Sequence, residues 1–184
     1  MTTIEHLLIA FARATQNRCL YDFYAAAAKK EGHNGLFTLF EQTATHEKAH
    51  AKRILRLLVD AEMPSLAPVM PIPARLGTSI ENLRAAVAIE QEEHASLYPT
   101  WARRARDEGQ DMVGKALESI AISHAQHALA FAEALQRLET GTLYKREEAV
   151  VWVCRKCGYV HTSLEAPVIC PACLHPQGHF EIFC

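Results

Sequence analysis

Apolar residues recur at helical spacing along four long stretches of the chain, at residues 3–31, 34–62, 78–109 and 111–139. Thr2 with Glu5 and Thr78 with Glu81 form capping-box patterns, which open the first and third stretches. Pro99 lies inside the third stretch and predicts a kink there. The pattern therefore predicts four long helices, the third of them kinked.

The connections between these stretches predict how the helices are arranged. Short links at residues 32–34 and 109–110 predict antiparallel neighbours within the first and second halves of the set. The link between the second and third stretches cannot continue a helix and predicts a crossover, because it contains Pro64, Pro68, Pro71 and Pro73. This order is typical of an all-α, ferritin-like four-helix bundle.

The character of the chain changes near Glu147. β-Branched residues, glycines, prolines and four cysteines replace the helical periodicity. This part is too short to build a sufficient apolar core of its own. The sequence predicts the bundle in residues 1–142, a linker in residues 143–149, and a small, metal-stabilised β/loop domain in residues 150–184.

Three of the four apolar stripes carry a pair of metal-capable residues near their midpoints. Each pair is spaced i, i+3, which places both side chains on one helix face. Counting steps of four and three residues along the stripes places these pairs on the inward face. The pairs are Glu47 with His50, Glu90 with Glu93, and His124 with His127.

Six polar groups at core positions require an explanation, because a buried carboxylate is costly unless it is paired or bound to metal. One explanation is a metal site, and mixed carboxylate and imidazole ligands suit iron, manganese or zinc. The other is a structural network in which the carboxylates bond the imidazoles without a metal. The remaining bundle histidines lie off the stripes or at helix ends and are expected to face solvent: His6, His33, His46 and His94.

Composition and charge exclude several classes of function. The chain has 184 residues, of which 49% are hydrophobic and 22% charged, as in soluble globular proteins. Its formal net charge of −2 provides no basic field for nucleic acid or an anionic membrane. No segment is long and apolar enough to predict a membrane span. No basic residue precedes Arg13, so a secretory signal is not expected and a cytoplasmic location is.

Four of the six cysteines form two CxxC hooks, Cys154 with Cys157 and Cys170 with Cys173. Two such hooks bring four thiolates around one tetrahedral ion, either zinc or a single iron. A disulfide alternative would need an oxidising compartment, which nothing in the sequence indicates. The other two cysteines, Cys19 and Cys184, receive no assigned role.

With these residues in view, the chain resembles the rubrerythrin family over essentially its whole length. The motifs that carry the resemblance are Cys154-Arg-Lys-Cys157-Gly158-Tyr159, Cys170-Pro-Ala-Cys173, Ala28-Lys-Lys-Glu-Gly32, His50-Ala-Lys-Arg53 and Tyr98-Pro99. The resemblance implies a carboxylate-bridged di-iron site in the bundle, a mononuclear iron on the four cysteines, and reduction of hydrogen peroxide to water. It also implies an external electron donor and a homodimer, either head-to-tail or helix-swapped.

The family's ligand positions carry over to this chain with two departures. By resemblance the bundle ligands include Glu47, His50, Glu90, Glu93 and His127, and Tyr21 and Tyr98 match tyrosines that orient ligand carboxylates. Where the family has a first-helix glutamate, this chain has Ala14, which offers no donor atom. Where the family has a bridging glutamate, it has His124, which binds one metal through one nitrogen. Glu47 is then the best remaining bridge.

Three functions are compatible with this sequence. The first is a rubrerythrin-type peroxidase, in which the four cysteines deliver electrons to the bundle. The second is an altered-metal member, whose bundle holds one ion or zinc and which transfers electrons or binds metal without peroxidase activity. The third is ferritin-like iron oxidation, which is a less economical explanation because it does not use the four C-terminal cysteines.

Overall fold

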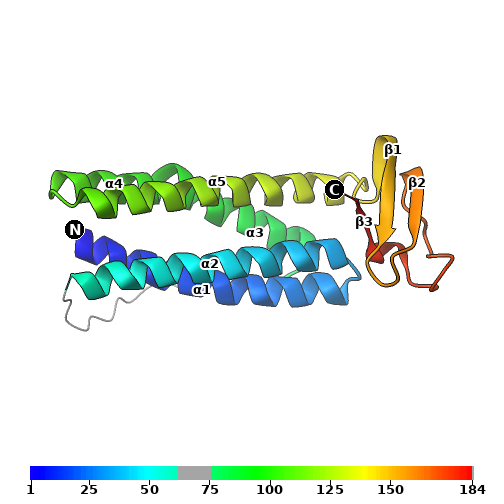
Figure 1. Cartoon of the computed structure of the whole chain (residues 1–184), viewed down its shortest axis with the longest axis horizontal. Coiled ribbons are helices and arrows are strands. Elements are labelled where there is room, and N and C mark those ends of the chain that lie inside the picture. The colour runs from blue at the N-terminus through cyan, green and yellow to red at the C-terminus, as the bar shows by residue number, and fades with distance from the viewer. Residues whose placement is uncertain (62–75, 184) are drawn as a thin grey trace.

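The computed structural model describes residues 1–61 and 76–183. The expected proline-rich crossover, the end of the second stretch at Glu62, and Cys184 lie outside these residues. Figure 1 shows an elongated helical bundle with a small sheet at one end. None of the described helices combines the length and the apolar character that crossing a membrane would require.

The first two helices form one antiparallel pair, α1 (Thr3–Lys30) and α2 (Asn34–Asp60). In α1 the expected capping box is present, because Thr2 accepts from the Glu5 amide and Glu5 reaches back to the amide of Thr2. Gly32 ends the helix with a φ of 85°, a conformation that side chains other than glycine rarely adopt.

The second pair consists of α5 (Asp111–Glu139) and a second helix that is interrupted near its middle. The predicted capping box of Thr78 and Glu81 opens α3 (Ser79–Glu92). A π-helical turn, η1 (Glu93–Leu97), follows, and α4 (Tyr98–Asp107) continues the same direction. The interruption therefore lies before Pro99 rather than at it, since Pro99 occupies the first turn of α4, where a missing N–H is tolerated.

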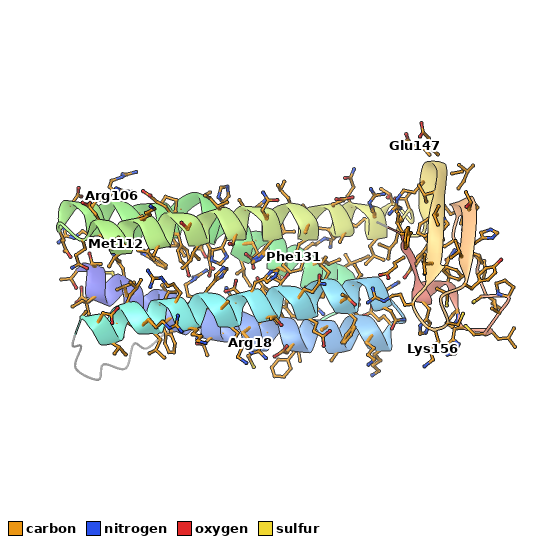
Figure 2. All side chains as sticks on the ribbon, in the orientation of Figure 1. Arg18, Arg106, Met112, Phe131, Glu147 and Lys156 are labelled. Atoms are coloured by element: carbon orange, nitrogen blue, oxygen red, sulfur yellow. The ribbon has the colours of Figure 1, made fainter. Side chains whose placement is uncertain are left out.

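The bundle core has two apolar clusters, one toward each end. One cluster contains Tyr21, Phe40 and Phe131, and the other contains Leu7, Ile54 and Leu117. Figure 2 shows Phe131 between the helix layers. The polar residues expected at inward positions lie between these two clusters along the helices, as the stripe pattern predicts.

The C-terminal part is a three-stranded antiparallel sheet in the order β2-β1-β3. The strands are β1 (Lys145–Cys154), β2 (Val160–Glu165) and β3 (Phe180–Ile182), with a 3₁₀ turn, η2 (Gln177–His179), before β3. Trp152, Phe180 and two cysteines form its small core. Because β1 begins at Lys145, most of the stretch expected to be a linker is strand. In Figure 2, Glu147 and Lys156 lie at opposite ends of this hairpin.

Specific contacts join the sheet to the end of the bundle where α2 begins. Asn34 donates to the carbonyl of Gly178 at 3.2 Å, and Arg155 donates to the Thr38 hydroxyl at 2.7 Å. A Cβ atom on Gly178 would lie only 1.7 Å from the carbonyl oxygen of Gly32. Glycine at position 178 is therefore required for this close backbone approach.

Candidate metal centres

Four cysteine sulfurs converge at the edge of the small sheet. The Sγ atoms of Cys154 and Cys173 are 3.8 Å apart, and those of Cys157 and Cys170 are 3.7 Å apart. Four thiolates bound at about 2.3 Å in a tetrahedron would stand about 3.8 Å from one another. The two hooks predicted from sequence therefore lie where a single tetrahedral ion fits.

Each of the two CxxC segments forms the same kind of backbone turn. The amide of Gly158 donates to the Cys154 carbonyl at 2.8 Å, and the amide of Leu174 donates to the Cys170 carbonyl at 2.9 Å. Burial raises the pKa of the Cys170 thiol, but the backbone amides of Cys173 and Ala172 outweigh it and lower this pKa to about 7. Cys157 is exposed, so one side of the site faces solvent.

A second group of potential ligands lies at the middle of the bundle. Donor atoms of Glu47 from α2, Glu90 from α3, and His124 and His127 from α5 lie within 4.8 Å of one another, and all four residues are buried. Of the six residues in the three predicted pairs, these four converge, whereas His50 and Glu93 lie outside the group.

Glu90 is the centre of this group. One of its oxygens lies 2.8 Å from Nδ1 of His124 and 3.2 Å from Nδ1 of His127, and the other accepts from the Tyr21 hydroxyl at 2.5 Å. Burial alone would raise the pKa of Glu90, but the bonds from the two histidines lower it to about 2. Glu90 is therefore a carboxylate at neutral pH. Tyr21 makes the hydrogen bond that the expected orienting role requires, and that role stays a prediction.

Glu47 has a different environment. Its Oε1 lies 3.0 Å from Nδ1 of His50, while its Oε2 is buried without a hydrogen-bond partner among the described residues. Burial raises the pKa of Glu47 to about 7. Burial and the neighbouring His124 and His127 lower the pKa of His50 to about 3, so His50 is a neutral, metal-competent imidazole at neutral pH.

Glu93 is fully buried but is held mainly from α1. Its Oε1 accepts from Nε of Arg13 at 2.7 Å and from the amide group of Asn17 at 3.0 Å. Ala14, which lies between these two residues in sequence, is also fully buried. Neither Arg13 nor Asn17 was expected from the sequence. Asn17 lies three residues after the inward Ala14 and is buried, so the helical spacing could have indicated it.

His124 lies between two carboxylates. Its Nδ1 is 2.8 Å from Glu90 and its Nε2 is 3.2 Å from Oε2 of Glu93. The ring centroid of Tyr98 is 4.7 Å from that of His124. Within the described part of the chain the Tyr98 hydroxyl has no hydrogen-bond partner, so the carboxylate bond expected of Tyr98 is replaced by a ring contact.

Two histidines expected to face solvent take part in packing or in the site. His6 is buried, with its ring centroid 5.8 Å from that of Trp101, so the prediction for His6 is wrong. His46 is exposed as predicted, but its Nδ1 lies 3.1 Å from Nε2 of His127. His33 is half-buried against Tyr144, and His94 is exposed.

The bundle residues fit a bound cation. Three carboxylates are fully buried there, and Oε2 of Glu47 has no hydrogen-bond partner among the described residues. Oε2 of Glu93 and Nε2 of His124 lie 3.2 Å apart, but neither makes a hydrogen bond with the other or with another described residue. A buried polar atom without a partner costs about 1–3 kcal/mol. A metal ion would satisfy such atoms and offset the negative charge, and this mixture of carboxylate and imidazole suits iron, manganese or zinc.

Known proteins resemble this chain over both its helical and its C-terminal part. The profile of the family described as Rubrerythrin matches residues 5–147, and that of the rubrerythrin rubredoxin-like domain matches residues 152–181. A rubrerythrin of Porphyromonas gingivalis is 43% identical over 97% of this chain and 88% of its own length. A rubrerythrin of Nitratidesulfovibrio vulgaris is 36% identical over 98% of this chain and 93% of its own length.

Solved structures of nigerythrin resemble the whole chain. One, in the fully reduced, all-ferrous state, has a TM-score of 0.69 and 25% identity, and the match covers 100% of this chain and 87% of that one. The two family profiles match in the order in which the chain carries the helical bundle and the four-cysteine domain. The chain therefore belongs to the rubrerythrin family and is a rubrerythrin-type iron protein.

Proposed function

We propose that this protein reduces hydrogen peroxide to water at the bundle centre. Each peroxide takes up two electrons and two protons, its O–O bond breaks, and two waters form. Iron bound at the two centres would supply the one-electron redox chemistry. The electrons enter from an external donor through the four-cysteine centre.

The observation that carries this proposal is the presence of two ligand sets of different chemistry in one chain. The carboxylate and imidazole set in the bundle suits a metal that meets an oxygen substrate, and the four thiolates suit an electron-transfer iron. Cys157 is exposed and gives the donor an approach to the second set.

A groove between α2 and α5 supports access by a small molecule. It encloses about 350 Å³ and is lined by His46, Ala49, His50, Ile122, Gln126 and His127, among others. Peroxide, with two oxygen atoms, is far smaller than this volume. His50 and His127 would therefore form the wall between the groove and the buried carboxylates.

The surrounding side chains have separate roles in this proposal. Glu47 and Glu90 supply the carboxylates, and Tyr21 holds Glu90 through its 2.5 Å hydrogen bond. The Tyr98 hydroxyl, which has no partner among the described residues, can donate to an oxygen atom of the substrate. Burial raises the pKa of Tyr98 well above its usual range, so this group keeps its proton at neutral pH.

Anaerobic mixing tests the proposal. The iron-loaded protein is fully reduced, mixed with hydrogen peroxide, and followed by the visible absorption of the four-cysteine iron and by peroxide consumption. We expect the oxidised absorption to return as peroxide disappears, with two electrons removed per peroxide. A reduced four-cysteine iron that stays reduced while peroxide persists would reject the proposal.

One observation favours a second candidate, a single-ion bundle centre without peroxidase activity. Ala14 offers no ligand, and Arg13 already supplies a positive charge to Glu93. Metal analysis after expression in iron-rich medium distinguishes the two. About three irons per chain support the peroxidase, whereas one iron, or one iron with one zinc, supports the second candidate.

We also propose a homodimer, because within one chain the bundle ligands lie far from the small sheet that carries the four cysteines. Glu47 lies thirteen residues after Asn34, or about 20 Å along α2 from the bundle end that contacts the small sheet. In a head-to-tail pair, the four-cysteine domain of a second copy would lie nearer the site. Sedimentation in solution tests this, and a monomer that retains full peroxide turnover would contradict it.

A further inference from the structure

His46 forms a hydrogen bond from the groove into the metal centre. Its Nδ1 lies 3.1 Å from Nε2 of His127, and the two ring planes differ by only 10°. Their centroids are 5.2 Å apart, and the two rings are nearly parallel with one nitrogen of each facing the other. One N–H···N hydrogen bond joins these two nitrogens.

The other nitrogen of His127 faces the carboxylates. Nδ1 lies 3.2 Å from Glu90 and 3.8 Å from Glu47. A ring with one nitrogen on the site and the other on a fixed partner has its orientation and its tautomer set by that partner. We propose that His46 is a positioning residue, which holds His127 with Nδ1 directed at the bundle metal.

The polarity of the bond can change with metal binding. Without metal, Nδ1 of His127 donates to Glu90, so Nε2 accepts from His46. With metal on Nδ1, the His127 proton must reside on Nε2, and His46 Nδ1 accepts it. An imidazole can serve in both states because each of its nitrogens can donate or accept.

Exposure distinguishes His46 from the other groups around the ligands. Tyr21, Asn17 and Arg13, which bond the glutamates, are buried or half-buried within the bundle, whereas His46 lies on the groove between α2 and α5. His46 can therefore be exchanged with little disturbance of the core, and its effect on the metal centre can be measured by itself.

The test compares His46→Ala with His46→Asn, since an asparagine amide can occupy the position of Nδ1. Gln42→Ala, one turn earlier on the exposed side of α2, is the matched control. Zinc affinity of the bundle is measured by competition with a chromophoric chelator, in full-length protein whose four-cysteine site already holds iron. We expect His46→Ala to weaken affinity about tenfold to a hundredfold, and His46→Asn and Gln42→Ala to stay near the parent protein.

A second measurement reports orientation without any metal in the bundle. Nitrogen NMR of the labelled His127 ring should show one tautomer, protonated on Nδ1, in the parent and in His46→Asn, and a mixture in His46→Ala. Unchanged affinity and tautomer in His46→Ala would overturn the proposal, as would equal losses in both variants. The inference rests on the metal centre of the proposed function but not on peroxide reduction, so its failure and that of the peroxidase proposal are distinguishable.

Discussion

Arg13 donates a 2.7 Å hydrogen bond from Nε to Oε1 of the fully buried Glu93. Most of the Arg13 side chain is also buried, with 21% exposed. The pair places an organic cation next to a carboxylate that the resemblance assigned to metal. Burial raises the pKa of Glu93, and Arg13 opposes this rise.

Arg13→Gln should therefore destabilise the metal-free protein by about 2 kcal/mol, somewhat less than the breaking of a fully buried ion pair. The measurement is urea unfolding without metal. The matched control is Arg84→Gln, which breaks an exposed pair with Glu139 and should change stability by less than about 1 kcal/mol. Equal losses for the two variants would mean that Arg13 does not stabilise Glu93.

Glutamates at positions 14 and 124, where the resemblance expects them, should add metal ligands to the bundle. We expect the double variant Ala14→Glu, His124→Glu to raise the number of metal ions in the bundle and to raise peroxide turnover. The reason is that each substitution adds a carboxylate facing the buried group, and only a carboxylate can bridge two ions.

The control for this variant is Ala14→Gln, His124→Gln, which has similar volume without the added charge. Metal content is measured by elemental analysis after loading with excess ferrous iron. If neither metal content nor turnover rises in the glutamate variant, the assignment of these two positions is incorrect.

Metal binding to the bundle should depend on pH through Glu47. Burial raises the pKa of Glu47 to about 7, so below this pH the metal-free protein holds a proton that a metal must displace. Burial lowers the pKa of His124, but the hydrogen bond to Glu90 and the nearby carboxylates outweigh it and raise this pKa, so a proton on this ligand competes with metal as well. The affinity should be flat well above pH 7 and should fall about tenfold per pH unit or more below it. Glu47→Gln should bind more weakly and show a shallower slope, as followed by zinc titration between pH 5.5 and 8.5.

The same shift has a consequence for stability in the absence of metal. A carboxyl whose pKa is raised on folding binds its proton more tightly in the folded protein. The contribution of Glu47 to the free energy of unfolding therefore becomes more favourable as pH falls from about 7 toward 4.5. Glu90 acts in the opposite sense at lower pH, because its pKa is lowered to about 2.

Cys157→Ser should abolish the visible absorption of the tail iron. It removes one of four thiolates, and the small domain depends on its metal because its apolar core is small. Cys19→Ser, on an exposed cysteine of α1, is the control and should leave the spectrum unchanged. Absorption that survives in Cys157→Ser would show that the tail does not hold iron.

The sequence predicted the helices and the four-cysteine site well, because both depend on local spacing. Each of these signals involves only a few adjacent residues: the capping boxes, the glycine at position 32 that ends a helix, and the two CxxC hooks. The inward pairs were also located, since a step of three along a helix fixes the face. The comparisons show the family and the fold, and the individual bundle ligands stay a prediction supported by their convergence.

Arg13 and His46 could not be predicted because periodicity gives the face of a helix but not the reach of a side chain. Arg13 lies beside the inward stripe of α1 and reaches Glu93 only because its side chain is long. His46 lies just off the stripe of α2, where solvent exposure and contact with His127 occur together. The π turn was missed because it spans only five residues, too few to show a change of period in the apolar pattern.

That turn, η1, brings together residues that a regular helix would separate. The amide of Tyr98 donates to the carbonyl of Glu93, five residues earlier. In an α-helix, two residues five apart would point about 140° away from each other. Here Glu93 and the ring of Tyr98 both face His124. Deleting one residue of η1 would place Glu93 and Tyr98 four residues apart in a regular α-helix, about 40° from each other, and would keep both beside His124. The π turn thus accommodates one additional residue in the helix without moving either side chain off the His124 face.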